Sequence, residues 1–154
     1  MISIEHIHPM IVHFPIVFFL TLAALDIIAL FKGAEITGRS AIGNISAGLA
    51  VLSGISSIVA YAFGDEALEI AEAGGFSSVI AENHEALGIA VAILFTIWAL
   101  IRGYLWMSQK QVSGVVKKLM VIFEIGGAAL VLTTAYFGGL LVYDLGVNVS
   151  LAVQ

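Results

Sequence analysis

The sequence predicts an all-α protein: an integral membrane four-helix bundle with antiparallel helices and a short amphipathic surface helix between the second and third spans. Three observations support this prediction. The 154-residue chain is 60% hydrophobic and 11% charged, with a mean hydropathy of +1.08, which is more apolar than a water-soluble domain of this size requires. Four stretches of roughly 20 nearly uncharged residues are long enough to cross a bilayer as helices. The charged residues gather mainly in the segments between these stretches.

We expect a single four-span domain over residues 1–154. Pro9 suits the first turn of the first span, because the N–H group that it lacks has no partner there. Pro15 falls in the second turn and can bend the helix. The expected spans run from about Met10 to Phe31, from about Ala41 to Phe63, through a third segment that ends near Met107, and from about Leu119 to Leu140.

The second connection contains an amphipathic segment. Apolar residues at 67, 68, 70 and 71 alternate with acids at 65, 66, 69 and 72, which predicts a short helix lying at the membrane surface. The pair Gly74-Gly75 should end this helix, and Ser77 or Ser78 can cap the next one. The tail from Leu141 to Gln154 is too short to span the membrane again as a helix.

The basic residues indicate the orientation of the chain. All six lie in the first and third connections or, for Arg102, in the last turns of the third span: Lys32, Arg39, Arg102, Lys110, Lys117 and Lys118. The positive-inside rule therefore places these two connections in the cytoplasm. Both termini are then expected on the periplasmic side of the cytoplasmic (inner) membrane.

The residues that could bind a cofactor or a metal ion lie at the outer ends of the helices. The stretch His6–Pro15 holds three of the four histidines, and His84 lies near the outer start of the third span. Histidine within a membrane span is rare and usually faces the bundle interior or a wet cavity. Since four antiparallel spans with short loops pack as a bundle, these histidines can meet near the outer surface.

Two motifs and a histidine resemble a bacterial membrane family called domain of unknown function 2231. They are His8-Pro9-Met10-x-Val12-His13-Phe14-Pro15, a histidine early in the third span, and Gly138-Gly139-x-Leu141-Val142-Tyr143-x-x-Gly146-Val147-x-Val149. The resemblance covers nearly the whole chain and implies a four-helix membrane protein. Some relatives are fused to, or encoded beside, cytochrome c or Rieske domains, and this implies a redox function. Many members have histidine before the glycine of the last motif, where this chain has Leu145.

One interpretation of the histidines is a haem b site. His13 and His84 on different antiparallel helices, at similar depth, could be the axial ligands of the iron. Faces of small residues on the second and fourth spans could accept the porphyrin edge. The structural alternatives are histidines satisfied in a hydrogen-bonded network and small-residue faces that serve helix packing.

A second interpretation is an ion site on the outer face. His6, His8, Met10 and His13 combine imidazoles with a thioether, which suits copper, and imidazoles with nearby acids suit zinc or iron. His84 could complete such a site. The alternative is that His6 and His8, expected to be extended ahead of Pro9, are undirected interfacial residues.

The inner half of the bundle contains three charged residues. Asp26, Arg102 and Glu124 lie at comparable depth on three spans, where unpaired charge is costly. We expect the two carboxylates to bracket the guanidinium. Structural pairing and a proton path are both open roles for this group.

The leading functional hypothesis is a haem-binding electron-transfer subunit that exchanges electrons with a periplasmic carrier, such as a basic cytochrome c, or with a membrane quinone. The alternatives are an outer-face metal-binding or transport accessory protein and a structural subunit of a membrane complex. An electron-transfer or binding role is favoured over a stand-alone enzyme. Self-association or assembly with other subunits is expected. The sequence has no phosphate loop, catalytic triad or nucleic-acid-binding patch, and no cysteine for disulfides or thiolate ligands.

Overall fold

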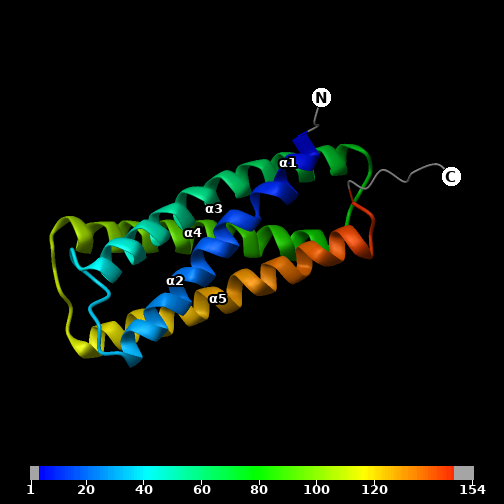
Figure 1. Cartoon of the computed structure of the whole chain (residues 1–154). Helices are drawn as coiled ribbons and strands as arrows, with labels where there is room; N and C mark the ends of the chain where they lie inside the picture. Colours follow the sequence, from blue (N-terminus) through cyan, green and yellow to red (C-terminus); the bar gives the residue numbers. More distant parts are fainter. Residues whose placement is uncertain (1–3, 148–154) are drawn as a thin grey trace.

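The computed structural model describes residues 4–147, which form five helices and no strand (Figure 1). The first two helices follow one another closely and act as one rod, so the chain forms four antiparallel rods. The α2 and α4 helices each pack against both α3 and α5, while α1 packs mainly on α3. The helices are α1 (Ile4–Ile11), α2 (His13–Phe31), α3 (Ala41–Ala73), α4 (Val79–Met107) and α5 (Gly114–Tyr143).

The bundle has two distinct ends (Figure 1). The terminal end contains α1, the turn between α3 and α4, and the C-terminal end of α5. The basic end contains the loops over residues 32–40 and 108–113, and five of the six basic residues lie in these loops or just after them in α5. Arg39 joins the first of these loops to the last turn of α4, because its guanidinium carbon lies 4.0 Å from the centre of the Trp106 indole ring.

The sides of the bundle suit a lipid environment. The segments His6–Phe31, Ala41–Ala73 and Val79–Met107 are long and apolar enough to cross a membrane. The α5 helix is 30 residues long, and Glu124 is its one charged residue between Leu119 and Tyr143. Large apolar side chains such as Phe31, Leu100 and Ile122 are exposed on the flanks. The predicted helical membrane bundle is therefore confirmed.

Serine residues begin three of the helices. The side chains of Ser40, Ser78 and Ser113 accept hydrogen bonds from backbone N–H groups in the first turns of α3, α4 and α5. Such capping satisfies N–H groups that have no partner within the helix. The prediction of a cap at Ser77 or Ser78 is confirmed for Ser78, which accepts from the N–H of Ile80 at 3.1 Å.

The acidic segment is helical, but the prediction of a separate surface helix was wrong. The α3 helix continues through it for 33 residues, about 50 Å, which exceeds a hydrocarbon core of about 30 Å. No strong helix breaker interrupts the chain there, so the acidic turns extend the second span. The predicted glycine stop is confirmed: Gly75 has a φ of +88°, and the N–H of Phe76 donates to the carbonyl of Ala71 at 3.1 Å.

The expectation that His6 and His8 are extended was also wrong. Both lie in α1, which includes Pro9. The interruption falls instead at Val12, between α1 and α2. Pro15 explains its position, since a proline displaces the carbonyl four residues earlier, and that residue is Ile11, the last of α1.

The centre of the bundle is closely packed. Phe19 of α2 and Phe95 of α4 stack with ring centroids 3.7 Å apart, and Gly127 of α5 leaves room for them. A Cβ at Gly54 of α3 would lie 2.7 Å from the Cβ of Ala99 on α4. The small residues at these two positions therefore serve helix packing. The predicted tail beyond residue 147 lies outside the described residues.

Candidate functional site

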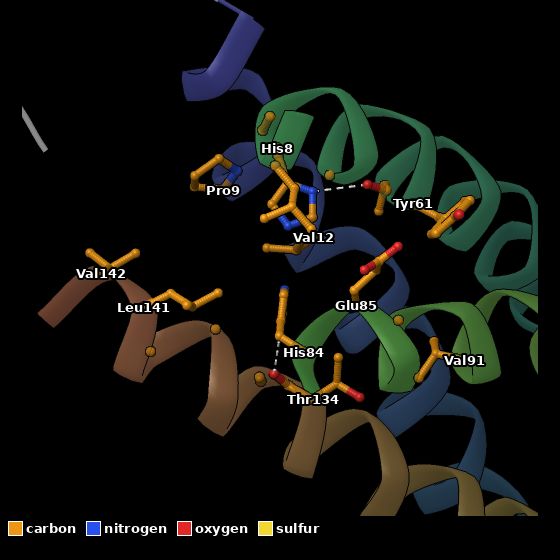
Figure 2. A pocket seen from close by; sticks show the side chains of 18 of the residues that line it. His8, Pro9, Val12, Tyr61, His84, Glu85, Val91, Thr134, Leu141 and Val142 are labelled. Carbon is orange, nitrogen blue, oxygen red and sulfur yellow. Dashed lines mark hydrogen bonds between the residues drawn. The ribbon is translucent and has the colours of Figure 1, made fainter. Parts of the chain in front are cut away.

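A cavity of about 440 Å³ lies at the terminal end, between the first rod, α3, α4 and α5 (Figure 2). Its wall is largely apolar and includes Val12, Val91, Val131, Leu141 and Val142. The polar and charged side chains in the wall come from several helices and are those of His8, His13, Ser57, Tyr61, Asp65, His84, Glu85, Thr134 and Tyr143.

His8 of α1 is half-buried and held against α3. Its Nδ1 lies 2.9 Å from the carbonyl oxygen of Ala60. A carbonyl can only accept, so Nδ1 carries the proton, and the neutral ring keeps its lone pair on Nε2. One helical turn further along α3, a Cβ at Gly64 would lie 2.7 Å from Cε1 of His8. The absence of a side chain at Gly64 therefore makes room for the ring.

His84 of α4 is held against α5 in the same way. Its Nδ1 lies 3.0 Å from the carbonyl oxygen of Thr134. Four residues later, a Cβ at Gly138 would lie 3.0 Å from Cε1 of His84. Each histidine thus donates Nδ1–H to a helix carbonyl and lies over the glycine one turn beyond it. Hydrogen bonding of the second ring nitrogen is the usual means of orienting a metal-ligating histidine.

The two imidazole rings point toward one another across the cavity (Figure 2). Their centroids are 6.1 Å apart, and their planes are inclined at 84°. A metal ion between two opposed imidazole nitrogens, with bonds of about 2.0–2.1 Å, separates the ring centroids by about 6 Å. The spacing of His8 and His84 therefore fits one metal centre shared between them.

The structure pairs His84 with His8, where the sequence predicted His13. His13 begins α2 and contributes to the cavity wall, but its side chain is exposed. Five residues separate the two positions, which is about 140° around a regular helix. His8 and His13 therefore point in different directions, and it is His8 that faces α3. His6 is exposed on α1.

The four histidines do not converge on one point. Within residues 4–147, no group of three or more His, Asp or Glu side chains is arranged to hold a metal ion. A bare zinc ion generally takes three or four protein ligands. The cavity instead offers one opposed pair of imidazoles, supplied by α1 and α4.

Sequence reasoning missed the role of Gly64. The acidic segment that follows it predicts a separate surface helix, and an extended N-terminus leaves His8 without a helix to contact. The available signal was the period of Ile4, Ile7 and Ile11, which indicates a helix that begins before Pro9. Gly138 was noted as part of a motif, without the packing contact that explains it.

The charged group predicted in the inner half of the bundle, Asp26, Arg102 and Glu124, is present in the structure. Arg102 lies between two carboxyl groups: its Nη2 is 2.8 Å from Oδ2 of Asp26, and its Nη1 is 3.7 Å from Oε1 of Glu124. All three side chains are buried. The prediction that Asp26 and Glu124 bracket Arg102 is confirmed.

Comparison with known proteins gives one result. A family model described as "Predicted membrane protein (DUF2231)" matches residues 5–151. No curated protein and no solved structure matches the chain significantly.

Proposed function

Because the chain belongs to the DUF2231 family of predicted membrane proteins, we propose a function within the membrane: it binds haem b between His8 and His84 and transfers electrons at the terminal end of the bundle. The observation that carries this proposal is the pair of imidazoles. Each ring is held by a hydrogen bond at Nδ1, and the two rings face one another across the cavity.

The number of ligands favours haem over a bare ion. A porphyrin supplies four nitrogen ligands, so the protein needs to add only axial ones, and imidazole is a common axial ligand. His8 and His84 would hold the haem iron between them, whereas a bare ion would need further side chains. Among the described residues, no such larger group is present. When bound, the haem would supply a one-electron redox centre.

Each histidine also keeps one ring nitrogen outside the hydrogen bonds among the described residues. An imidazole has two ring nitrogens, and each of them can make a hydrogen bond or bind a metal. Over residues 4–147, His8 and His84 each make one hydrogen bond, through Nδ1. The remaining nitrogens face the cavity, where they are available to a ligand.

The cavity wall sets the environment for such a ligand. Its apolar side chains would exclude water from the histidines and hold the porphyrin face. Among the described residues, no lysine or arginine lines the cavity, so the carboxylates of a haem would have to reach water rather than an ion-pair partner. Asp65 and Glu85 place negative charge in the same wall.

The last turns of α3 suggest the kind of redox partner. Asp65, Glu66, Glu69 and Glu72 lie at the terminal end, and the basic residues are concentrated at the opposite end. We propose that a cationic carrier, such as a basic cytochrome c, docks there from the periplasm. Increasing ionic strength should weaken this association, because salt screens exposed charges.

An absorption spectrum of the detergent-purified protein tests the haem proposal. The wild type, prepared with ample haem supply and then reduced, should show a Soret band with sharp α and β bands. His8→Ala and His84→Ala should each lose the six-coordinate spectrum, because each removes one axial imidazole. His13→Ala is the matched control and should retain it.

Two outcomes would contradict the proposal. Absence of a Soret band in the wild type would end the haem assignment, and metal analysis of the same sample would then test the ion-binding alternative. Loss of the spectrum in His13→Ala, with retention in His8→Ala, would restore the pairing of His13 with His84 expected from the sequence.

A further inference from the structure

The buried group near the basic end has a charge imbalance that pairing alone does not resolve. Asp26 of α2 and Glu124 of α5 are fully buried, and Arg102 of α4 is 2% exposed. Two carboxylates and one guanidinium leave one uncompensated negative charge. An unpaired charge in an apolar interior is strongly unfavourable, and such groups commonly neutralise by taking up a proton.

The surroundings of the group supply no second positive charge. Ser46 of α3 donates to Oδ1 of Asp26, and Trp98 of α4 donates to Oε1 of Glu124 at 3.2 Å. Both donors are neutral. The guanidinium also donates to the carbonyl oxygen of Ile36 at 2.9 Å. All four rods of the bundle therefore contribute to the group, and Arg102 is the cation among the described contacts.

The two carboxyl groups share one cation. Oδ2 of Asp26 lies 2.8 Å from Nη2 of Arg102, and Oε1 of Glu124 lies 3.7 Å from Nη1 of the same side chain. Because one guanidinium offsets one carboxylate, neutralising the group requires that one of the two carboxyl groups keep its proton. Within residues 4–147, Oε2 of Glu124 has no hydrogen-bond partner. One proton held by the pair of carboxyl groups would remove the excess charge.

Further unpartnered polar atoms lie in the loop over residues 32–40, at the basic end. Thr37 is 3% exposed, and its Oγ1 has no hydrogen-bond partner in the described part of the chain. It follows Ile36, whose carbonyl accepts from Arg102. Oε2 of Glu35 also has no partner, while its Oε1 lies 2.6 Å from Nζ of Lys117. Buried polar atoms without protein partners commonly mark ordered water.

The loop over residues 32–40 lies against the buried group and contains both of these polar side chains. The side chain of Glu35 is 37% exposed and reaches water, and Thr37 lies beside the backbone that Arg102 contacts. We propose that Asp26 and Glu124 form a proton-binding site that exchanges its proton with water at the basic end of the bundle through Thr37 and Glu35. On release, the proton passes to water and leaves the group with one net negative charge. This site does not depend on haem binding.

Infrared spectroscopy of the purified protein tests whether the proton is present. At neutral pH the exposed carboxylates are ionised, so a C=O stretch of a protonated carboxyl group reports a buried acid. We expect such a band in the wild type. The band should shift when the protein contains glutamate or aspartate with ¹³C at the side-chain carboxyl group. The label that shifts the band identifies the residue type that holds the proton, without any substitution.

Glu124→Gln and Asp26→Asn should each remove the band from the protonated-carboxyl region. Glu66→Gln, at the terminal end, is the control and should leave it unchanged. Absence of the band in the labelled wild type would overturn the proposal, whether or not the variants fold. Persistence of the band in both folded core variants would also overturn it.

The rate of exchange tests the route. On transfer from H₂O to D₂O, Thr37→Val should slow the isotope shift of the band several-fold, because it removes the buried hydroxyl while conserving volume. Thr133→Val is the matched control: Thr133 is exposed on α5, and its hydroxyl donates to the carbonyl of Ala129 at 2.8 Å. Equal rates in these two variants would overturn the Thr37 route.

The buried hydroxyl of Ser53 tests the opposite direction. Ser53 is fully buried on α3, and its Oγ has no partner among residues 4–147. It lies between Ser46, which contacts Asp26, and Ser57, which lines the cavity. Ser53→Ala should leave the exchange rate unchanged. Slowing by Ser53→Ala in place of Thr37→Val would show exchange through the cavity and overturn the route to the basic end.

Discussion

Two glycines determine where the paired histidine rings can lie. Gly64 and Gly138 each leave space for an imidazole on a neighbouring helix, and a Cβ at either position would meet the ring. The contact would be closer at Gly64, at 2.7 Å, than at Gly138, at 3.0 Å. The first distance is too short for any Cβ, so His8 would have to move, whereas a shift of a few tenths of an ångström would suffice for His84.

We therefore expect Gly64→Ala to displace the His8 ring and break its hydrogen bond to the Ala60 carbonyl. In ¹⁵N NMR spectra of histidine-labelled protein, the signals of one ring should shift strongly. If haem is bound, the haem-to-protein ratio of the purified variant should also be lower than that of the wild type. Gly48→Ala is the matched control on the same helix, because a Cβ there meets nothing within 4 Å. Unchanged His8 signals in Gly64→Ala would show that the glycine is not required.

Gly138→Ala should have a smaller effect on His84 in the same measurement. Gly139→Ala provides its control, since the neighbouring position is open. A larger perturbation from Gly138→Ala than from Gly64→Ala would contradict the order of the two contacts.

Single backbone features decide how the helices are divided. Pro15 accounts for the interruption at Val12, and this interruption leaves α1 free to lie against α3. Gly64, in contrast, does not interrupt α3, because one glycine lowers helix stability by only about 1 kcal/mol relative to alanine. The acidic turns consequently continue the second span, where the sequence alone suggested a separate helix.

The packing of α3 against α4 depends on small residues. A Cβ at Gly54 would lie 2.7 Å from the Cβ of Ala99 and 3.1 Å from the carbonyl oxygen of Phe95. We expect Gly54→Ala to lower the free energy of unfolding by about 1–3 kcal/mol, the usual range for overpacking. Denaturant unfolding in detergent measures this change.

A compensating substitution makes the packing prediction specific. Ala99→Gly removes the side-chain atom nearest to the new Cβ, so the double variant should recover part of the lost stability. Gly48→Ala, on the exposed side of α3, should be neutral or slightly stabilising. A Gly54→Ala variant as stable as Gly48→Ala would contradict the close approach of the two helices.

The whole molecule separates its charges between two ends. Five of the six basic residues lie in or next to the loops at one end, and most of the acids lie at the other. The positive-inside rule then predicts that the loops over residues 32–40 and 108–113 face the cytoplasm. The histidine cavity would in that case open on the periplasmic side, where a soluble electron carrier can reach it.

Cysteine labelling tests this orientation directly, because the natural chain contains no cysteine. Ser77→Cys lies in the exposed turn at the terminal end, and Gln111→Cys lies in the exposed loop at the basic end. A membrane-impermeant maleimide should label Ser77→Cys in intact spheroplasts and Gln111→Cys only after permeabilisation. The reverse pattern would invert the topology.

Hydropathy and charge were sufficient to predict the class of fold. Long apolar stretches must become helices in a bilayer, because every backbone polar group needs an internal partner there. The family assignment, the glycine stop at Gly75 and the bracketing of Arg102 also followed from local patterns. The last succeeded because the depth of each charge can be counted along its own helix, and burial then leaves few possible partners.

The identity of the histidine pair was decided by tertiary structure. Whether His8 or His13 faces His84 depends on the rotation of each helix about its axis, and that rotation follows from contacts with Gly64 and Gly138 on other helices. A one-residue change in the point where a helix begins rotates its side chains by about 100°. Sequence patterns define depth well and rotation poorly, so the partner of His84 emerged only when the four rods were packed together.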